Sequence, residues 1–583
     1  MAGSSPATDF AVALLAALVR AGVRDVVLSP GSRSQAIALA AAEFEDAGAI
    51  RLHVRIDERV AGFLAIGIAV ETDTPVLVVT TSGTAVANLH PAVLEAHHSG
   101  VPLILLTADR PPELRGIGSN QTTQQPGIFG FATGWMRDVE APSETGFDPD
   151  YPGELAREAY SAAAGHSSAP GPVQLNLAFR EPLSGPIGAL PPMSGSSASR
   201  GSSSALELRG ARSGSATPAP TEPAKSVNLT RTGRDLAPAH LTARANTIVI
   251  AGHDAGELAE QTARALGAPL LAEVSSGAHF GPNLVVAYRE LLNDDHFGGR
   301  IERVVVFGHP TLSREIPALV QRAGIETIVV RGSSPIDYNP GHAAAQIVDS
   351  VEVTGDPDSD RAWLGSWVHT SRQLLEVRPE QLSHEQSVPA MALSQMQVFR
   401  ESVTRRMLVE AVWRVTWPHD RLILGASRLI READAVVPGK RISVHANRGL
   451  SGIDGTISTG IGIALASQTD DAGAIGVTRV LLGDLAAFHD VGALLFGTGE
   501  PRPLIQVIVA NDGGGTIFDG LEVAASARPE AFDRVMLTPQ SVDLKALAEA
   551  YGWNYLLAGN RGELDESLSA SAGPTIIEVP LSR

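Results

Sequence analysis

RVLLGD (residues 479–484) and LIQVIVANDGGG (residues 504–515) each predict a short strand that runs into a loop of glycine and aspartate. Both apolar runs are typical of strands that are covered on both faces of a sheet. If the two strands are parallel neighbours, Asp484 and Asp512 lie at the same carboxyl edge, where open α/β sheets bind their ligands.

This pair of carboxylates suits a hard metal ion. Mg²⁺ takes one or two carboxylates and fills its remaining positions with phosphate oxygens and water. The glycines Gly513–Gly515 allow the backbone to approach a diphosphate closely. Taken alone, the pattern fits equally well two surface loops that each contain an acid and a glycine turn.

The N-terminal third of the chain alternates apolar strands with amphipathic helices, which predicts a parallel sheet covered by helices on both faces. The first helix is expected at Phe10–Leu18, with Thr8 as its N-cap and Gly22 just past its end, and the second begins at about Ser34. The strands expected there are Asp25–Ser29, Arg51–Arg55, Val76–Thr80 and Pro102–Thr107.

The alternation recurs twice, which predicts an α/β protein with three doubly wound parallel-sheet domains. The further strands expected are Thr247–Ala251, Arg303–Phe307, Thr327–Val330, Leu422–Leu424, Arg441–His445, Arg479–Leu482 and Leu504–Ala510. Ser194–Ser226, rich in Ser, Gly, Ala and Pro, predicts a flexible linker, and the polar stretch Arg378–Gln386 marks another boundary. The predicted division is domains at 1–190, 229–375 and 401–583, with linkers at 191–228 and 376–400.

Composition restricts the class of protein. Apolar residues make up 44 % of the chain, enough for a sizeable core, and the net charge of −19 disfavours nucleic acid as a partner. The chain has no cysteine, which excludes disulfides and thiolate metal sites. The apolar N-terminal run lacks a basic flank, and no stretch is long enough to span a membrane, so we expect a cytoplasmic protein.

The Gly483-Asp484 and Asn511-Asp512-Gly513 segments resemble the motif that binds diphosphate and Mg²⁺ in thiamine-diphosphate-dependent enzymes. The resemblance implies Asp484, Asp512 and the Gly514 carbonyl as ligands of Mg²⁺ or Mn²⁺. It implies that Gly483, Leu485 and Asn511 also contact the cofactor. The sequence departs from the family at Leu485, where many members have a small residue, and at Asp512, where many have Asn.

Within that family, motifs in both outer domains resemble the carboligases of menaquinone biosynthesis, in the same order along the chain. These motifs are 29–34 (SPGSRS), 81–88 (TSGTAVAN), 107–114 (TADRPPEL), 120–121 (NQ), 125–127 (QPG), 425–427 (GAS) with Arg431, 445–449 (HANRG) and 451–455 (SGIDG). The resemblance implies three domains of the thiamine-diphosphate enzyme type and a homodimer or homotetramer with active sites at the dimer interface. The middle domain matches only in outline.

Two residues matter for the cofactor itself. The resemblance assigns Glu58 to the aminopyrimidine ring, a role that needs a carboxyl with raised proton affinity in an apolar pocket. It places Ile453 beneath the two rings, where a bulky aliphatic side chain enforces their bend, and adds Gly83 to the cofactor contacts. Without the resemblance, Glu58 is an acid opening an exposed helix, and Ile453 is an ordinary core residue.

The substrates implied by the resemblance are 2-oxoglutarate and isochorismate, which together carry four carboxylates. The implied reaction decarboxylates 2-oxoglutarate and adds the succinyl carbanion equivalent to isochorismate. Arginine binds carboxylate through two parallel hydrogen bonds, so this chemistry calls for several fixed arginines. The substrate-binding candidates are Ser32, Arg33, Arg110, Asn120, Gln121, Arg314, Ser427, Arg431 and Arg448, of which Ser32, Arg33, Gln121, Ser427, Arg431 and Arg448 join Glu58 and Ile453 as catalytic candidates.

Several alternatives stay open. Each arginine alone could form a surface salt bridge, and Ala426 stands where the family commonly has Asn. Another thiamine-diphosphate 2-oxoacid decarboxylase, or an acetolactate-synthase-like carboligase, would share the metal motif and Glu58. Gly460-Ile461-Gly462 loosely resembles a dinucleotide fingerprint but lacks the third glycine. An inactive regulatory subunit is disfavoured by the joint presence of Glu58, Asp484 and Asp512.

Overall fold

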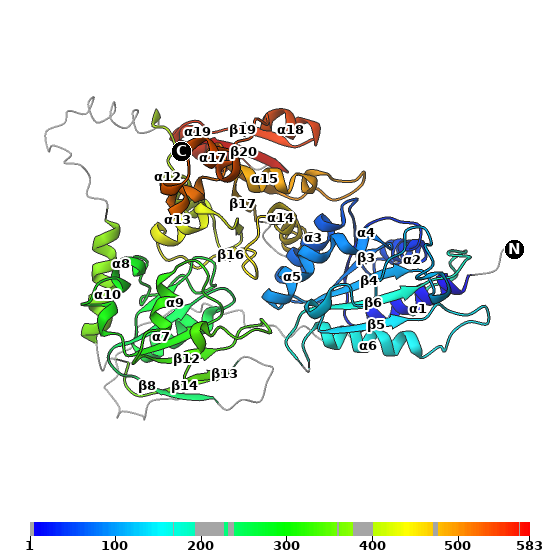
Figure 1. Cartoon of the computed structure of the whole chain (residues 1–583), viewed down its shortest axis with the longest axis horizontal. Coiled ribbons are helices and arrows are strands. Elements are labelled where there is room, and N and C mark those ends of the chain that lie inside the picture. The colour runs from blue at the N-terminus through cyan, green and yellow to red at the C-terminus, as the bar shows by residue number, and fades with distance from the viewer. Residues whose placement is uncertain are drawn as a thin grey trace, which may run out of the picture.

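The computed structural model describes residues 5–166, 168–192, 227–230, 238–357, 361–376, 400–469, 476–570 and 572–583. Three all-parallel sheets follow one another along the chain and form three lobes (Figure 1). This confirms the predicted fold class. Most of both predicted linkers lies outside the described residues, and the exact domain boundaries stay predictions.

The N-terminal sheet has six parallel strands in the order β2-β1-β3-β4-β6-β5. Its strands are β1 (Asp25–Leu28), β2 (Arg51–Val54), β3 (Val76–Thr80), β4 (Leu103–Asp109), β5 (Trp135–Val139) and β6 (Pro172–Ala178). Its helices are α1 (Pro6–Ala21), α2 (Gln35–Asp46), α3 (Glu58–Thr72), α4 (Thr84–Asn88), α5 (His90–Ser99) and α6 (Tyr151–Ala163). Alternate residues of β3 enter the cores on the two faces of the sheet, as expected for a doubly wound fold.

The start of α1 was predicted wrongly. Helix α1 begins at Pro6 and is capped by Ser5, whose Oγ accepts a hydrogen bond from the Thr8 amide at 3.1 Å. Pro6 is suited to the first helical position because its missing N–H would have no partner there. Thr8 is therefore a buried residue of the first turn rather than the cap.

The central region contains a five-stranded parallel sheet in the order β10-β9-β11-β12-β13 and a three-stranded sheet in the order β7-β14-β8. The strands are β7 (Val227–Thr230), β8 (Ala239–Thr242), β9 (Thr247–Ala251), β10 (Leu270–Ala272), β11 (Arg303–Phe307), β12 (Glu326–Val330), β13 (Gln346–Val348) and β14 (Ser350–Thr354). The helices are α7 (Glu257–Leu266), α8 (Tyr288–Leu292), α9 (Glu315–Val320) and α10 (Arg361–Leu375). The small sheet was not predicted and is mixed, since β7 runs antiparallel to β14.

The C-terminal sheet repeats the strand order of the first, as β16-β15-β17-β18-β20-β19, and all its strands are parallel. Its strands are β15 (Arg421–Leu424), β16 (Ser443–His445), β17 (Thr478–Gly483), β18 (Ile505–Asn511), β19 (Asn554–Leu557) and β20 (Thr575–Pro580). Its helices are α12 (Arg405–Val415), α13 (Arg428–Val436), α14 (Thr456–Ser467), α15 (Asp484–His489), α16 (Glu522–Ser526), α17 (Pro529–Phe532), α18 (Leu544–Ala550) and α19 (Arg561–Ser569). β17 and β18 are parallel neighbours, as predicted.

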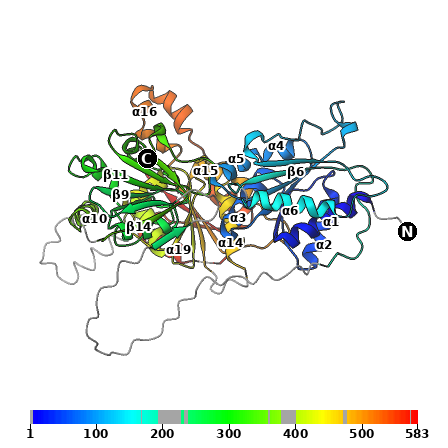
Figure 2. The same cartoon turned by 90° about the horizontal axis from the view of Figure 1, so that it is seen from below.

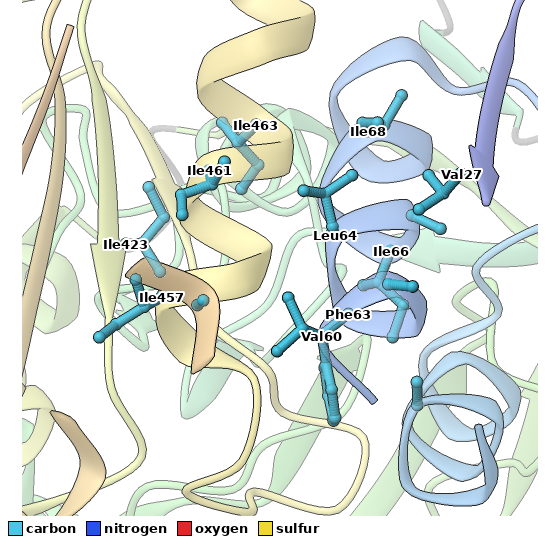
Figure 3. Close-up of a cluster of buried hydrophobic side chains, with 14 of the residues drawn as sticks. Val27, Val60, Phe63, Leu64, Ile66, Ile68, Ile423, Ile457, Ile461 and Ile463 are labelled. Atoms are coloured by element: carbon cyan, nitrogen blue, oxygen red, sulfur yellow. The ribbon is translucent and has the colours of Figure 1, made fainter. Parts of the chain in front are cut away.

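Helices α3 and α14 pack side by side between the first and third sheets (Figures 1 and 2). Both helices are apolar almost all round, which is typical of helices buried on every side. Their side chains belong to a single hydrophobic cluster that also contains residues of both sheets, such as Val27 of β1 and Ile423 of β15 (Figure 3). The two outer lobes therefore share one core.

Glycines set the distance between these two helices. A Cβ atom on Gly67 would lie 2.1 Å from the Thr459 carbonyl oxygen, and one on Gly462 would lie 2.1 Å from the Leu64 carbonyl oxygen. The backbones can approach this closely only because neither position carries a side chain. Gly462 thus lies inside a helix, at the point where α14 crosses α3. This placement excludes the interpretation of Gly460-Ile461-Gly462 as a dinucleotide-binding loop. None of the described helices is long and apolar enough to cross a membrane.

We expect Gly462→Ala to destabilise the protein by about 1–3 kcal/mol, because the methyl group must push α3 and α14 apart. The fall in the midpoint of thermal unfolding, followed by circular dichroism, measures the effect. Gly365→Ala is the matched control, since Gly365 lies in the exposed part of α10 with open space around it. A Gly462→Ala protein as stable as this control would contradict the crossing as described.

Candidate active site

A cavity of about 140 Å³ lies at the carboxyl edge of the C-terminal sheet, where β17 and β18 end. Seven of the residues assigned to the site from the sequence line it. They are Ser427, Ile453, Gly483, Asp484, Leu485, Asp512 and Gly514. Arg405, Thr516, Ile517 and Phe518 line it as well and were not predicted. The parallel pairing of β17 with β18 thus brings the two acidic loops to one pocket.

The two acids differ in their surroundings. Asp484 is buried at the start of α15, and its Oδ1 accepts a hydrogen bond from the Leu485 amide at 2.7 Å. Burial raises the pKa of Asp484 to about 6, the Asp512 carboxylate adds to this, and backbone N–H groups of the 513–514 loop oppose it. A raised pKa from burial beside a second acid is typical of a functional carboxylate.

Asp512 is held by a cation that the sequence did not reveal. Arg405 Nη2 donates to Asp512 Oδ2 at 2.8 Å, and Thr516 Oγ1 donates to the same oxygen at 2.6 Å. Arg405 is the first residue of α12, whose N-cap is Thr404. No motif marks Arg405 because its distance from Asp512 is set by packing between segments far apart in sequence. Among the described residues, every hydrogen bond of the Asp512 carboxylate ends on Oδ2, which leaves Oδ1 for a ligand.

The glycine loop after β18 is shaped by its lack of side chains. Gly513 and Gly514 have φ values of 80° and 136°, and a Cβ on Gly514 would lie 2.2 Å from the Leu537 carbonyl oxygen. Such a loop leaves backbone groups open to a phosphate. Asn511, predicted to contact the cofactor, does not line the cavity, because its side chain donates to Glu578 Oε1 at 2.8 Å.

The cavity fits a metal-bound diphosphate better than a metal held by protein alone. No group of three or more His, Asp or Glu side chains that could hold an ion occurs in the part of the chain that the structure describes. Two carboxylates beside a glycine loop are the donor set from which Mg²⁺ binds phosphates. Ile453 adds an aliphatic side chain that lines the cavity and remains 37 % exposed.

Glu58 lies outside this cavity. It is the first residue of α3, whose N-cap is Asp57, and the Asp57 Oδ1 accepts hydrogen bonds from the Arg59 and Val60 amides at 2.9 and 3.3 Å. Glu58 is half-buried in the single chain. The cap explains why the helix begins there, and it leaves the Glu58 side chain at the end of the helix.

A second group of predicted residues gathers at the carboxyl edge of the N-terminal sheet. Arg110 donates to Ser82 Oγ and to the Gln121 carbonyl oxygen, and the Gly83 amide donates to Gln125 Oε1 at 3.2 Å. Arg33 donates to the Phe179 carbonyl oxygen at 3.0 Å, and its pKa is lowered by burial and by nearby Arg110. Ser32, Asn120 and Gln121 have exposed side chains at the same edge.

The remaining predicted arginines lie where the central region meets the C-terminal sheet. Arg431, on α13, donates to the Ser427 carbonyl oxygen at 3.0 Å, and burial lowers its pKa. Arg448 is buried and donates to Thr311 Oγ1 and to the Thr311 carbonyl oxygen at 2.9 and 3.1 Å. Arg314 is 81 % exposed and faces Glu522 at 3.7 Å. Of these three, none lines the cavity at β17 and β18.

Asp490 ties together the two segments that carry Asp484 and Ile453. It follows α15 directly, and its Oδ2 accepts a hydrogen bond at 2.8 Å from the Ser458 amide, in the first turn of α14. Burial raises the pKa of Asp490 to about 6, although the hydrogen bonds from Ser458 oppose the shift. The carboxyl therefore costs stability when it is ionised in the folded protein.

This predicts a pH dependence that Asp490→Asn removes. Below an ordinary pKa of 3.8 the carboxyl is protonated in both states; between 3.8 and about 6 it ionises only in the unfolded protein, so folded stability falls as pH rises. Asparagine keeps an acceptor for Ser458 but cannot ionise. The thermal midpoint of Asp490→Asn should therefore rise relative to wild type between pH 4 and 6.5 and then stay level. A difference independent of pH would contradict this.

Comparison with known proteins first gives the class. Residues 8–130 match the family model "Thiamine pyrophosphate enzyme, N-terminal TPP binding domain". The whole chain also resembles the crystal structure of benzoylformate decarboxylase from Polynucleobacter necessarius, with a TM-score of 0.61 over 98 % of both chains. At 16 % sequence identity, that likeness concerns the fold alone. Fold, family model and pocket together define the class of thiamine-diphosphate enzymes.

Curated relatives then give the particular family. A 2-succinyl-5-enolpyruvyl-6-hydroxy-3-cyclohexene-1-carboxylate synthase from Leifsonia xyli subsp. xyli is 57 % identical, over 99 % of this chain and 97 % of its own length. Proteins of the same name from Clavibacter michiganensis subsp. michiganensis and Arthrobacter sp. are 55 % and 41 % identical over 99 % and 97 % of this chain. The matched regions span 97 % and 88 % of the lengths of these two relatives. The chain belongs to this family of synthases, which are thiamine-diphosphate-dependent transferases.

Proposed function

We propose that this protein decarboxylates 2-oxoglutarate and adds the succinyl unit to isochorismate in menaquinone biosynthesis. The observation that carries the proposal is the cavity lined by Asp484, Asp512, Gly514, Gly515 and Ile453, in a chain of this family. That donor set fits thiamine diphosphate with Mg²⁺ or Mn²⁺. When bound, thiamine diphosphate supplies a carbon nucleophile and an electron sink for decarboxylation.

The residues at the sheet edge have separate tasks in this proposal. Asp484, Asp512 and the Gly514 carbonyl would hold the metal ion, and the glycine loop would hold the diphosphate. Arg405 keeps Asp512 oriented through its hydrogen bonds to Oδ2. The side chain of Ile453 would support the rings of the cofactor and keep water away from them.

The arginines would bind the substrates. Two dicarboxylic substrates bring four negative charges, and Arg33, Arg110, Arg431 and Arg448 are fixed cations of the right geometry. Arg33 and Arg431 each donate from one nitrogen to a backbone carbonyl, and within the described part of the chain their other side-chain N–H groups make no hydrogen bond, so they could bind carboxylate in a fixed orientation. The exposed Ser32, Asn120, Gln121 and Arg314 would complete the substrate contacts from the rim.

We also propose a homodimer as the smallest active unit, located in the cytoplasm. In the single chain, Glu58 and the two metal-binding acids do not share a cavity. A second copy that places its own Glu58 opposite the cavity would bury this carboxyl, and burial raises the proton affinity that its role requires. There the Glu58 carboxyl would share a proton with the pyrimidine ring of the cofactor.

The decisive experiment supplies 2-oxoglutarate, isochorismate, thiamine diphosphate and Mg²⁺ to the purified protein and identifies the products by mass spectrometry. We expect the succinyl adduct of isochorismate to form. Release of succinic semialdehyde alone would assign a decarboxylase instead. Loss of 2-oxoglutarate only when isochorismate is present would strengthen the carboligase assignment.

Two variants separate binding from chemistry. Asp484→Asn should abolish Mg²⁺-dependent binding of thiamine diphosphate in calorimetry, because it removes a metal ligand. Glu58→Gln should still bind the cofactor but lower kcat by about a hundredfold to ten-thousandfold, the usual contribution of a general acid–base group. Glu45→Gln, at an exposed position on α2, is the control for Glu58→Gln. Full activity of Glu58→Gln would refute the role assigned to Glu58.

A further inference from the structure

Arg448 occupies a place where all three sheet regions meet. It lies in the loop after β16 of the C-terminal sheet, it is only 2 % exposed, and its Nε and Nη2 both bond to Thr311 of the central region. Its Nη1 is buried and has no hydrogen-bond partner among the described residues. The side chain is thus fixed through two of its nitrogens, and the N–H groups of the third, Nη1, remain available for a ligand.

The N-terminal region holds the loop from one side. Glu95, on α5, is buried, and its Oε1 and Oε2 accept hydrogen bonds from the Gly449 and Leu450 amides at 2.7 and 2.8 Å. Ser99 Oγ donates to the same Oε1 at 3.1 Å. A Cβ on Gly449 would lie 2.7 Å from Ser99 Oγ and 2.8 Å from the Glu95 carbonyl oxygen, so α5 and the loop are in close contact.

In the central region, Glu273 holds Thr311, the residue to which Arg448 donates its hydrogen bonds. Glu273, directly after β10, is fully buried, and its Oε1 alone accepts hydrogen bonds from the Thr311 and Leu312 amides, both at 2.6 Å. Thr311 in turn receives both bonds from Arg448. The contacts therefore run without a break from Glu273 through Thr311 to the guanidinium.

We propose that Glu95 and Glu273 are positioning residues for Arg448: Glu95 fixes the backbone that carries it, and Glu273 fixes the threonine that orients its guanidinium. The inference rests on the substrate-binding role proposed for Arg448. Because both carboxyls come from outside the C-terminal sheet, the orientation of this arginine depends on how the other two regions sit against that sheet. Neither carboxyl touches substrate or cofactor.

The two carboxyls respond differently to replacement by glutamine. Burial and the neighbouring Asp434 raise the pKa of Glu273 to about 8, so at neutral pH this carboxyl resembles a neutral amide. Glu273→Gln keeps one oxygen for both amides and should behave like wild type. Glu95 uses both oxygens as acceptors, and glutamine would present an N–H group to one of the two amides. Glu95→Gln should therefore fail where Glu273→Gln succeeds.

A double-mutant cycle tests this through activity. We expect Glu95→Gln and Glu273→Ala each to lower kcat/KM by about tenfold to a hundredfold, mainly through the KM of one acidic substrate. In an Arg448→Ala background the same changes should cost less than about threefold, because residues that act through one partner are not additive. With Arg448 intact, Glu273→Gln should keep the activity near that of wild type, in contrast to Glu273→Ala.

The matched control is Glu500→Gln, which removes another carboxylate that joins the N-terminal and C-terminal regions, with Oε1 accepting from the Val54 amide at 2.9 Å and Oε2 accepting from Arg55 Nη1 at 2.8 Å. Any loss that it causes should be the same in both backgrounds, as for a purely structural effect. Equal losses from Glu95→Gln in both backgrounds, or an impaired Glu273→Gln, would overturn the proposal.

Amide hydrogen exchange keeps this test separate from the proposed function. If wild type gives no adduct, the proposed function fails, but the contacts can still be measured. Glu95→Gln should speed exchange at Gly449 and Leu450 while sparing Thr311 and Leu312, and Glu273→Ala should do the reverse. Rapid exchange of these four amides in wild type would contradict the positioning role without any variant.

Discussion

The close crossing of α3 and α14 is the constraint on which the rest of the structure depends. The backbones touch at Gly67 and Gly462, and the side chains around them form one hydrophobic cluster that includes residues of both outer sheets. A larger residue at either glycine would separate two sheets as well as two helices. The distance between the two outer sheets therefore depends on the lack of a side chain at Gly67 and Gly462. The positions of the loops at the sheet edges depend on that distance.

Most of the outer sheets could be predicted from sequence, because their strands are apolar runs that end in glycine, proline or acid. β3 has the predicted bounds, as do β9 and β11 of the central sheet, and β17 and β18 differ from prediction by one residue at each end. The parallel strands β5, β6, β10, β13, β19 and β20 and the mixed sheet around β14 were missed. Most of these strands have only three to five residues, which carry too little pattern to distinguish a strand from a loop, and their pairing is decided by distant partners.

The site followed the same division. Asp484 and Asp512 could be predicted to meet because parallel neighbouring strands end at one edge. Arg405 and Glu273 could not, because a lone arginine on a helix or a lone glutamate after a strand has many possible uses. Their roles arise only when packing brings them to Asp512 and Thr311, and that distance is a property of the assembled fold.

The burial of Arg448 has a physical reason in this arrangement. A buried cation is costly unless its donors are satisfied, and here Thr311 accepts hydrogen bonds from two of its nitrogens while the Glu95 side chain lies close by. Lysine could not replace it, because a point charge on a flexible stem cannot bond Thr311 twice and keep another donor in a fixed direction. An arginine that is already oriented loses less conformational entropy when it binds a carboxylate. The contacts that fix Arg448 at this junction therefore make binding of the carboxylate tighter and more selective.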